Sequence, residues 1–269
     1  MGAGSRTDFS LDRIREALEA AASVMSGFVP GKVKADFKSG DDPVTEADRA
    51  ANRVLREVLL RDGEGWLSEE SEDDLDRLAR DRVWVVDPLD GTREFVAGIP
   101  EWCVSVALVE NGRAVAGGIS NPATGEITLG GLGYGVTCNG QPARPSQKSS
   151  LEGARVLASR SEVKRGEWDR FQGGSLVIQP MGSVAYKLAR VAVGKADATW
   201  TLTPKHEWDV AAGVALVTAA GGGVRSLANS PLTFNNQAAL LPGLVAGGPH
   251  LIEPLCAFLE DYARVAFGG

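Results

Sequence analysis

The chain has 269 residues, of which 43% are hydrophobic, so it is long enough to bury a sizeable core in one or two domains. Its formal net charge is -7, and its lysines and arginines are scattered, which argues against a nucleic acid polymer as a partner. No signal peptide opens the chain and no apolar segment approaches the ~20 residues that span a bilayer, so we expect a cytoplasmic protein without a membrane partner.

The cysteines and histidines limit the kinds of metal site that the chain can build. Cys103, Cys138 and Cys256 are odd in number and far apart, which indicates buried free thiols in a reducing compartment. His206 and His250 are the only histidines, so a histidine-rich zinc or iron site is excluded. Any metal must therefore be held by oxygen ligands.

Two helices are predicted near the amino terminus. Apolar residues at helical spacing predict the first from about Ser10 to near Gly27. The polar residues 31–42 predict an exposed loop that could close over a substrate. Residues 45–48, Thr-Glu-Ala-Asp, form a capping-box pattern that starts a second helix and places Asp48 in its first turn. On local sequence alone, Asp48 has the ordinary role of stabilising the helix dipole.

Two short strands are then predicted to end in acidic residues. Residues 66–68 lead into an acidic cluster that begins with Glu69 and Glu70, and Val83 to Val86 form a buried strand that stops at Asp87. The two strand ends could be adjacent and share a metal. If the first strand continues, Glu69 and Glu70 point to opposite sides, so only one of them should reach the cation.

Two carboxylates, a glycine and a hydroxyl follow directly after the second of these strands. Asp87 and Asp90 can converge on one hard cation, and the carbonyl of Leu89 between them can add a further oxygen ligand. Gly91 allows a ligand to approach the backbone closely. Thr92 can open a helical turn whose free N–H groups would receive an anion. A metal beside an anion site suggests phosphate chemistry.

Three other interpretations of this segment compete with a phosphate site. Asp, Pro and Gly are the commonest turn formers, so Asp87 and Asp90 could simply shape a turn. An aspartyl-phosphate phosphatase would need its nucleophile where Pro88 stands. A calcium loop of the EF-hand kind needs acidic or amide residues at alternate positions, which Pro88 and Leu89 do not supply.

The middle of the chain predicts an antiparallel meander. Residues 102–109 and 114–119 flank Asn111-Gly112, which is typical of a hairpin, and strands punctuated by glycine continue over 126–138. The composition changes over 141–153, where Pro142, Pro145 and a cluster of Ser and Lys occur. We therefore expect a domain boundary in that segment.

This boundary divides the chain into two predicted domains. Residues 1–145 form an α+β domain with an antiparallel sheet and the main metal motif, and residues 146–269 form an α/β domain that completes the metal and substrate site. In the second domain, Asp209 would cap a helix, and Lys187 could lie on a solvated helix face. Strands are predicted at 154–158, 175–179, 196–200 and 243–247, and helices at 162–171, 183–193, 210–220 and 249–266.

Three segments, in chain order, resemble the inositol monophosphatase superfamily of magnesium-dependent, lithium-sensitive phosphomonoesterases: Glu69-Glu70-Ser71, residues 87–92 and Trp208-Asp209. The resemblance implies a metal-dependent phosphoric monoester hydrolase with the layered αβαβα sandwich of the inositol monophosphatase and fructose-1,6-bisphosphatase type. It also implies that the metal ligands are Glu69, Asp87, the Leu89 carbonyl, Asp90 and Asp209. Asp48 and Thr92, with Glu69 beside them, match the residues associated with water activation.

The same resemblance implies the cofactor and the partners. We expect two or three Mg²⁺ ions, inhibition by Li⁺, and replacement by Ca²⁺ without activity. The substrate would be a small phosphorylated molecule, hydrolysed without a covalent enzyme intermediate. The protein would be a monomer or a homodimer.

Within the superfamily, the sequence resembles most the 3'(2'),5'-bisphosphate nucleotidases. The matching segments are residues 90–95, Ser159-Arg160-Ser161, Gly182-Ser183 followed by Lys187, and Pro204. The resemblance implies hydrolysis of 3'-phosphoadenosine 5'-phosphate to AMP and phosphate. The residues that it implies for substrate binding are Gly91, Thr92, Ser159, Arg160, Gly182, Ser183, Lys187 and Asp209.

Other substrates stay open. Inositol phosphatases place a Glu several residues before the Trp-Asp pair to hold sugar hydroxyls, whereas residues 201–204 are Thr-Leu-Thr-Pro here. The alternative is an inositol-1-monophosphatase or another small sugar or polyol phosphatase, such as the histidinol-phosphate or fructose-bisphosphate relatives. A non-enzymatic metal- or anion-binding protein is a remote alternative, and the complete set of acidic ligands argues against it.

Overall fold

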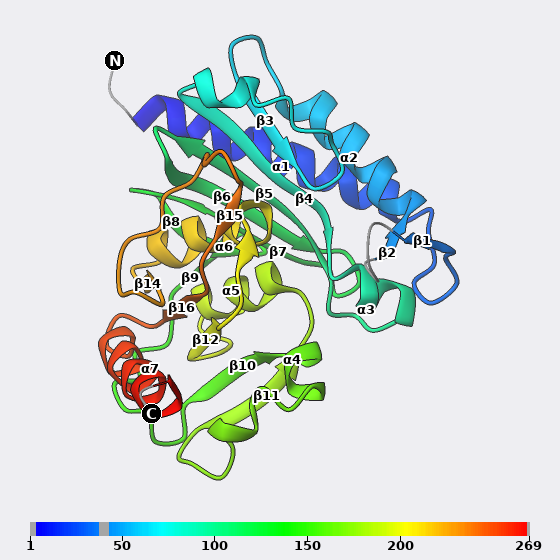
Figure 1. Cartoon of the computed structure of the whole chain (residues 1–269). Coiled ribbons are helices and arrows are strands. Elements are labelled where there is room, and N and C mark those ends of the chain that lie inside the picture. The colour runs from blue at the N-terminus through cyan, green and yellow to red at the C-terminus, as the bar shows by residue number, and fades with distance from the viewer. Residues whose placement is uncertain (1–3, 38–42, 268–269) are drawn as a thin grey trace.

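Helices and sheets alternate in layers through the computed structural model, which describes residues 4–37 and 43–267 (Figure 1). Helices α1 (Gly4–Met25) and α2 (Glu46–Leu59) cover one face of a seven-stranded sheet. Helices α5 (Val184–Ala192) and α6 (Glu207–Ala219) lie between this sheet and a second, five-stranded one. Helix α7 (Ile252–Phe267) packs on the far face of the second sheet. The predicted layered αβαβα fold is confirmed.

The seven-stranded sheet has its strands in chain order. β3 pairs with β4 in parallel, and all later pairs are antiparallel. In the predicted hairpin, Asn111 and Gly112 have φ values of 49° and 76°, as a two-residue turn of the primed type requires. The strands from β3 to β9 are Gly65–Ser68, Arg82–Asp90, Cys103–Glu110, Arg113–Asn121, Glu126–Gly131, Gly135–Cys138 and Gln141–Ala143.

The five-stranded sheet is mixed. β10 is parallel to β11 and β12, whereas β16 is antiparallel to β12 and β14. In the spatial order β11-β10-β12-β16-β14, the strands are Val177–Met181, Arg155–Ser159, Ala198–Thr201, Leu244–Gly247 and Gly223–Ser226. The two sheets use residues 65–143 and 155–247, and the domain division at residue 145 stays a prediction.

Two small antiparallel pairs lie outside these sheets. β1 (Ala35–Phe37) pairs with β2 (Pro43–Thr45), and β13 (Lys205–His206) pairs with β15 (Leu240–Leu241). The sequence did not predict them, because strands of two or three residues are too short to show a period. β13 nevertheless matters, since it leads directly into α6.

Separate apolar cores join the layers. Trp84 lies in the core between the seven-stranded sheet and the helices α1 and α2. Leu188 and Leu216 belong to the core around α5 and α6. Trp168 and Trp200 stack at 4.7 Å in the core beneath α7. Because burial of apolar surface is the main favourable term in folding, these cores fix the two sheets against the helices between them.

Several predicted bounds are wrong. α1 begins at Gly4, not near Ser10. The strand expected to stop at Val86 continues through Asp90. The helix predicted over 162–171 is two short pieces, α4 (Arg160–Lys164) and a 3₁₀ turn at Asp169–Phe171. Between them Gly166 takes a φ of 77°, which no right-handed helix accommodates.

Three further expectations concern membrane-spanning helices, the cysteines and the loop before α2. Within residues 4–37 and 43–267, no helix combines the length and the apolar character that crossing a membrane requires. The three cysteines are free, with Cys103 and Cys256 buried as predicted and Cys138 half-buried. Residues 38–42 of the predicted substrate-covering loop lie outside the described residues.

Candidate active site

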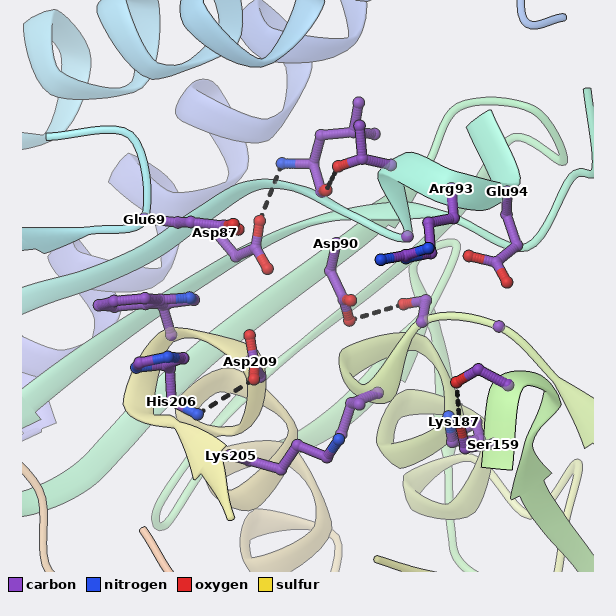
Figure 2. A pocket seen from close by; sticks show the side chains of 18 of the residues that line it. Glu69, Asp87, Asp90, Arg93, Glu94, Ser159, Lys187, Lys205, His206 and Asp209 are labelled. Carbon is purple, nitrogen blue, oxygen red and sulfur yellow. Dashed lines mark hydrogen bonds between the residues drawn. The ribbon is translucent and has the colours of Figure 1, made fainter. Parts of the chain in front are cut away.

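A polar pocket of about 300 Å³ lies where the end of β4 meets the amino-terminal ends of α3 (Thr92–Ala97), α5 and α6 (Figure 2). The predicted metal and substrate residues line it together: Glu69, Asp87, Leu89, Asp90, Gly91, Thr92, Ser159, Arg160, Gly182, Ser183, Lys187 and Asp209. Asp48 is not on the pocket wall and lies behind Thr92. Of the acidic pair, Glu69 lines the pocket and Glu70 does not.

A β-bulge at the end of β4 aims its carboxylates. Asp87 pairs with Ser105 of β5 and Asp90 pairs with Cys103, so two residues of β4 face one residue of β5. Pro88, which has no N–H to give to the sheet, fits such a bulge. The carboxylate of Asp87 then accepts a hydrogen bond from the Leu89 N–H at 3.0 Å. The bulge therefore turns both aspartates toward the pocket.

Gly91 is the turn between β4 and α3. Its φ is 97°, and a Cβ at this position would lie 2.8 Å from the carbonyl oxygen of Glu101. Only glycine satisfies both restrictions. The chain can therefore begin α3 with Thr92 immediately beside the carboxylates.

Asp90 connects the first sheet to helix α5. Its carboxylate accepts hydrogen bonds from the Ser183 hydroxyl at 2.8 Å and from the Ala185 N–H at 2.6 Å. Ser183 also accepts from the Tyr186 N–H at 3.0 Å, so it caps α5. Ser183, which the sequence suggested as a substrate contact, thus holds Asp90 in place in this structure.

Asp209 lies one turn inside the pocket end of α6. The predicted role as the N-cap is wrong, because His206 is the N-cap and Asp209 is the third helical residue. The Asp209 carboxylate accepts from the His206 N–H at 3.1 Å, which is the second half of a capping box. Its side chain therefore points back toward the start of α6, where it lines the pocket.

The carboxylates of the pocket repel one another. Burial, and then the charges of Glu69, Asp90 and Asp209, raise the pKa of Asp87 well above its usual range. Burial, and then Asp90 and Glu69, raise the pKa of Asp209 well above its usual range. Carboxylates that are buried (Asp87) or half-buried (Glu69, Asp90 and Asp209), that repel one another and that offer only oxygen atoms fit a hard divalent cation.

Binding of a divalent cation would require some movement of the carboxylate side chains. Across the described ranges, no three His, Cys, Asp or Glu side chains are grouped as a cage ready to hold an ion. Like charges disfavour close approach in a site that is shielded from solvent. A bound cation would neutralise the carboxylates and draw them together.

Thr92 and Asp48 form a pair behind the pocket. The Thr92 hydroxyl lies 3.1 Å from an Asp48 carboxylate oxygen and 3.0 Å from the Leu89 carbonyl, so its one hydrogen has two acceptors within reach. The other Asp48 oxygen accepts from the Thr45 N–H and hydroxyl. Burial raises the pKa of Asp48, and hydrogen bonds from Thr45 only partly oppose that rise.

Two lysines, Lys187 and Lys205, line the same pocket as the carboxylates. Lys187 is only 3% exposed, so its interpretation as part of a solvated helix face is wrong. Its ammonium donates to the Met181 carbonyl at 3.4 Å. Burial, more than any neighbouring charge, lowers the pKa of Lys187, whereas the charge of Asp90 raises it. The Lys205 ammonium lies 3.9 Å from the buried carboxylate of Glu162.

Arg160 is already paired. Its guanidinium contacts the Glu101 carboxylate with nitrogen–oxygen distances down to 2.6 Å, and Glu101 also accepts from the Gly182 N–H at 2.7 Å. Glu101 was not predicted as a site residue, because it lies 59 positions from Arg160 and no local pattern marks it. Glu162 was not predicted either, although Ser159 and Glu162 have the spacing of a capping box.

Comparison with known proteins agrees with the fold. The profile of the inositol monophosphatase family matches residues 7–260. An inositol-1-monophosphatase from Rhizobium meliloti is 35% identical over 199 residues, covering 71% of this chain and 74% of that protein. The structure of an inositol monophosphatase from Anabaena superposes with a TM-score of 0.78 at 28% identity, over 95% of this chain and 97% of that one. CysQ from Bacteroides thetaiotaomicron superposes with a TM-score of 0.74 at 28% identity, over 89% of this chain and 97% of that one.

Proposed function

The chain belongs to the inositol monophosphatase family, and on this premise we propose that it is a Mg²⁺-dependent 3'(2'),5'-bisphosphate nucleotidase. Members of this family are metal-dependent phosphatases of small phosphorylated substrates, so the chain is a phosphoric monoester hydrolase. The proposed reaction converts 3'-phosphoadenosine 5'-phosphate to AMP and inorganic phosphate.

The single observation that carries this choice of substrate is the buried cation of Lys187. A bisphosphate presents a second phosphate away from the scissile one, and a protein of net charge -7 needs fixed positive charges to hold it. Lys187 is nearly fully buried in the pocket wall, and Lys205 lines the same pocket. A monophosphate substrate offers no second phosphate for these two lysines to bind.

The proposed metal ligands are Glu69, Asp87, the Leu89 carbonyl, Asp90 and Asp209. When bound there, Mg²⁺ would polarise the phosphate, lower the pKa of a water molecule and offset the charge of the leaving oxygen. Li⁺ inhibition and loss of activity with Ca²⁺ are part of the same proposal. We propose that this set of oxygen ligands holds two or three Mg²⁺ ions.

Residues of the chain itself would accept the proton of the attacking water. We assign the Thr92 hydroxyl, with Asp48 at 3.1 Å behind it, to orient the attacking water and accept its proton. Because burial raises the pKa of Asp48, this carboxylate holds a proton more readily than a solvated one. Glu69 would act beside them.

The remaining substrate contacts follow from the pocket wall. Gly91, Ser159, Gly182 and Ser183 line the pocket together with Lys187, so we propose them as further contacts of the substrate. Glu101 neutralises Arg160, so this arginine contributes less to anion binding than the resemblance suggested.

A second candidate function is inositol-1-monophosphatase, because relatives such as the Rhizobium meliloti protein carry that name. Against it, residues 201–204 offer no carboxylate where inositol phosphatases hold sugar hydroxyls. Phosphate release from the two substrates, measured side by side with purified protein and Mg²⁺, separates the candidates. We expect a higher kcat/KM for 3'-phosphoadenosine 5'-phosphate than for inositol 1-phosphate; the reverse order rejects the nucleotidase proposal and leaves the phosphatase.

A further inference from the structure

Two aromatic side chains form a flat surface on the wall of the pocket. The rings of His206 and Trp208 stack with 4.3 Å between their centroids and 5° between their planes. Both line the pocket together with Lys205 and Asp209, and Figure 2 shows His206 beside these two side chains. Nothing in the hydrolysis of a phosphate ester needs a stacked aromatic pair at this place.

Backbone and core contacts hold the pair in place. His206 belongs to β13, which pairs with β15 through Leu240. Its backbone N–H donates to the Asp209 carboxylate at 3.1 Å. Trp208 is half-buried and packs against the apolar core around α5 and α6. The indole therefore supports one face of the imidazole, while His206 itself is exposed in the pocket.

A rigid, exposed aromatic plane beside a fixed cation suits one kind of ligand. Nucleobases stack on aromatic side chains through their flat faces, and such stacking changes affinity by about tenfold per base. Lys205, the neighbour of His206, lies 3.9 Å from the Glu162 carboxylate and also lines the pocket, where its ammonium can contact a phosphate on the same molecule. Polyols and sugars have no flat face to offer.

We propose that the stacked pair His206–Trp208 is a base-binding platform that selects nucleotides over other bisphosphates. This inference rests on the proposed nucleotidase function. The base lies against the exposed face of His206, and Trp208 keeps the imidazole in the plane that the base requires. The platform acts on binding, so its loss raises KM more than it lowers kcat.

Two substrates that differ only in the base provide the test. One is 3'-phosphoadenosine 5'-phosphate, and the other is methyl ribofuranoside 3,5-bisphosphate, which has both phosphates and no base. We expect the unaltered enzyme to prefer the nucleotide by about tenfold in kcat/KM. In His206→Ala the ratio of the two kcat/KM values should fall toward one, mainly through a higher KM for the nucleotide. In His206→Phe the preference should be restored, because phenylalanine again supplies a flat ring.

His250 provides a matched control, since it is the other histidine, is exposed and is not part of the pocket. His250→Ala should keep the full preference for the nucleotide. If His206→Ala does not fold, the comparison of the two substrates on the unaltered enzyme and on His206→Phe still decides the matter.

The outcomes distinguish the platform from the function on which it rests. Equal kcat/KM for the two bisphosphates, both hydrolysed well, overturns the platform alone. An undiminished preference in His206→Ala also overturns it, as does an equal loss in His206→Ala and His206→Phe, which would point to imidazole chemistry in place of stacking. Hydrolysis of inositol 1-phosphate with no release from either bisphosphate rejects the nucleotidase function and the platform together.

Discussion

The Thr92 hydroxyl lies 3.1 Å from a carboxylate oxygen of Asp48, although the two residues are 44 positions apart in the chain. Thr92 begins α3 and Asp48 lies in the first turn of α2. The capping box fixes Asp48, since its other oxygen accepts from both the N–H and the hydroxyl of Thr45. The first turn of α2 thus presents the Asp48 carboxylate to the Thr92 hydroxyl at the start of α3.

Thr92 and Asp48 should act as one unit in catalysis. Thr92→Ala and Asp48→Asn should each lower kcat by about 10²–10⁴, which is the usual range for general-base assistance. Because the two residues serve the same proton, the double variant should be little slower than the worse single variant. Steady-state kinetics of the three variants gives the answer, with thermal unfolding as the control for loss of the Asp48 cap. Losses that simply multiply would indicate separate roles.

Asp209→Asn should change metal binding and stability in opposite directions. The pKa of Asp209 is raised in the folded state, so ionisation of this carboxylate destabilises the metal-free protein. The variant should therefore have a higher Tm than the unaltered protein in a chelator, and should gain less Tm when Mg²⁺ is added. Its kcat should fall sharply. Asp62→Asn, at an exposed carboxylate outside the pocket, should match the unaltered protein; an Asp209→Asn protein that Mg²⁺ stabilises fully would remove this residue from the ligands.

Local patterns predicted the parts of the site that depend on neighbours in the sequence. The capping box at Thr45 placed Asp48 correctly, and the apolar run before Asp87 identified the strand that carries the motif. The turn at Asn111 and Gly112 followed from the same kind of signal. Each of these features is decided within a few residues, so the sequence alone contains it.

Features that depend on tertiary packing could not be predicted. Lys187 appeared to lie on an exposed helix face, but α5 lies between two sheets and is buried on nearly every side. The ion pair of Arg160 with Glu101 joins segments that only the fold brings together. Neither the spacing of apolar residues nor a sequence motif indicates such a contact, because both describe a single helix, strand or loop.

Arg77 should be essential for stability, although it is charged. It is 1% exposed, pairs with Asp73 at 2.7 Å, and donates to Asn235 Oδ1 at 2.7 Å and to the Asn236 carbonyl at 3.0 Å. Removal of one partner from a buried polar network typically costs about 3 kcal/mol. Urea unfolding of Arg77→Met should show a loss of that order. Arg80→Met, at an exposed arginine three residues away, is the control and should change little; similar values for the two would refute the importance of the network.

The effect of Glu64 on stability should depend on pH. Burial alone would raise the pKa of Glu64, but hydrogen bonds from Trp84 and Arg13 and the charges of Arg13 and Arg82 outweigh it and lower the pKa. A lowered folded-state pKa stabilises the protein above the unfolded value of about 4.3, and this gain is lost as the pH falls through the folded value. The difference in unfolding free energy between the unaltered protein and Glu64→Gln should thus be larger at pH 7 than at pH 3. A difference that does not vary with pH would show that the charge contributes nothing.

If the pocket recognises a second phosphate, the enzyme should prefer a bisphosphate to the matching monophosphate. The ratio of their kcat/KM values tests this most directly. Adenosine 3',5'-bisphosphate and adenosine 3'-monophosphate share the base, the ribose and the scissile phosphate, and differ only in the 5'-phosphate. Charge-assisted contacts to that group should give the bisphosphate a kcat/KM about tenfold or more higher. Lys187→Met should abolish most of this advantage, while Lys164→Met, at an exposed lysine of α4, should preserve it. A ratio near one in the unaltered enzyme would contradict the account.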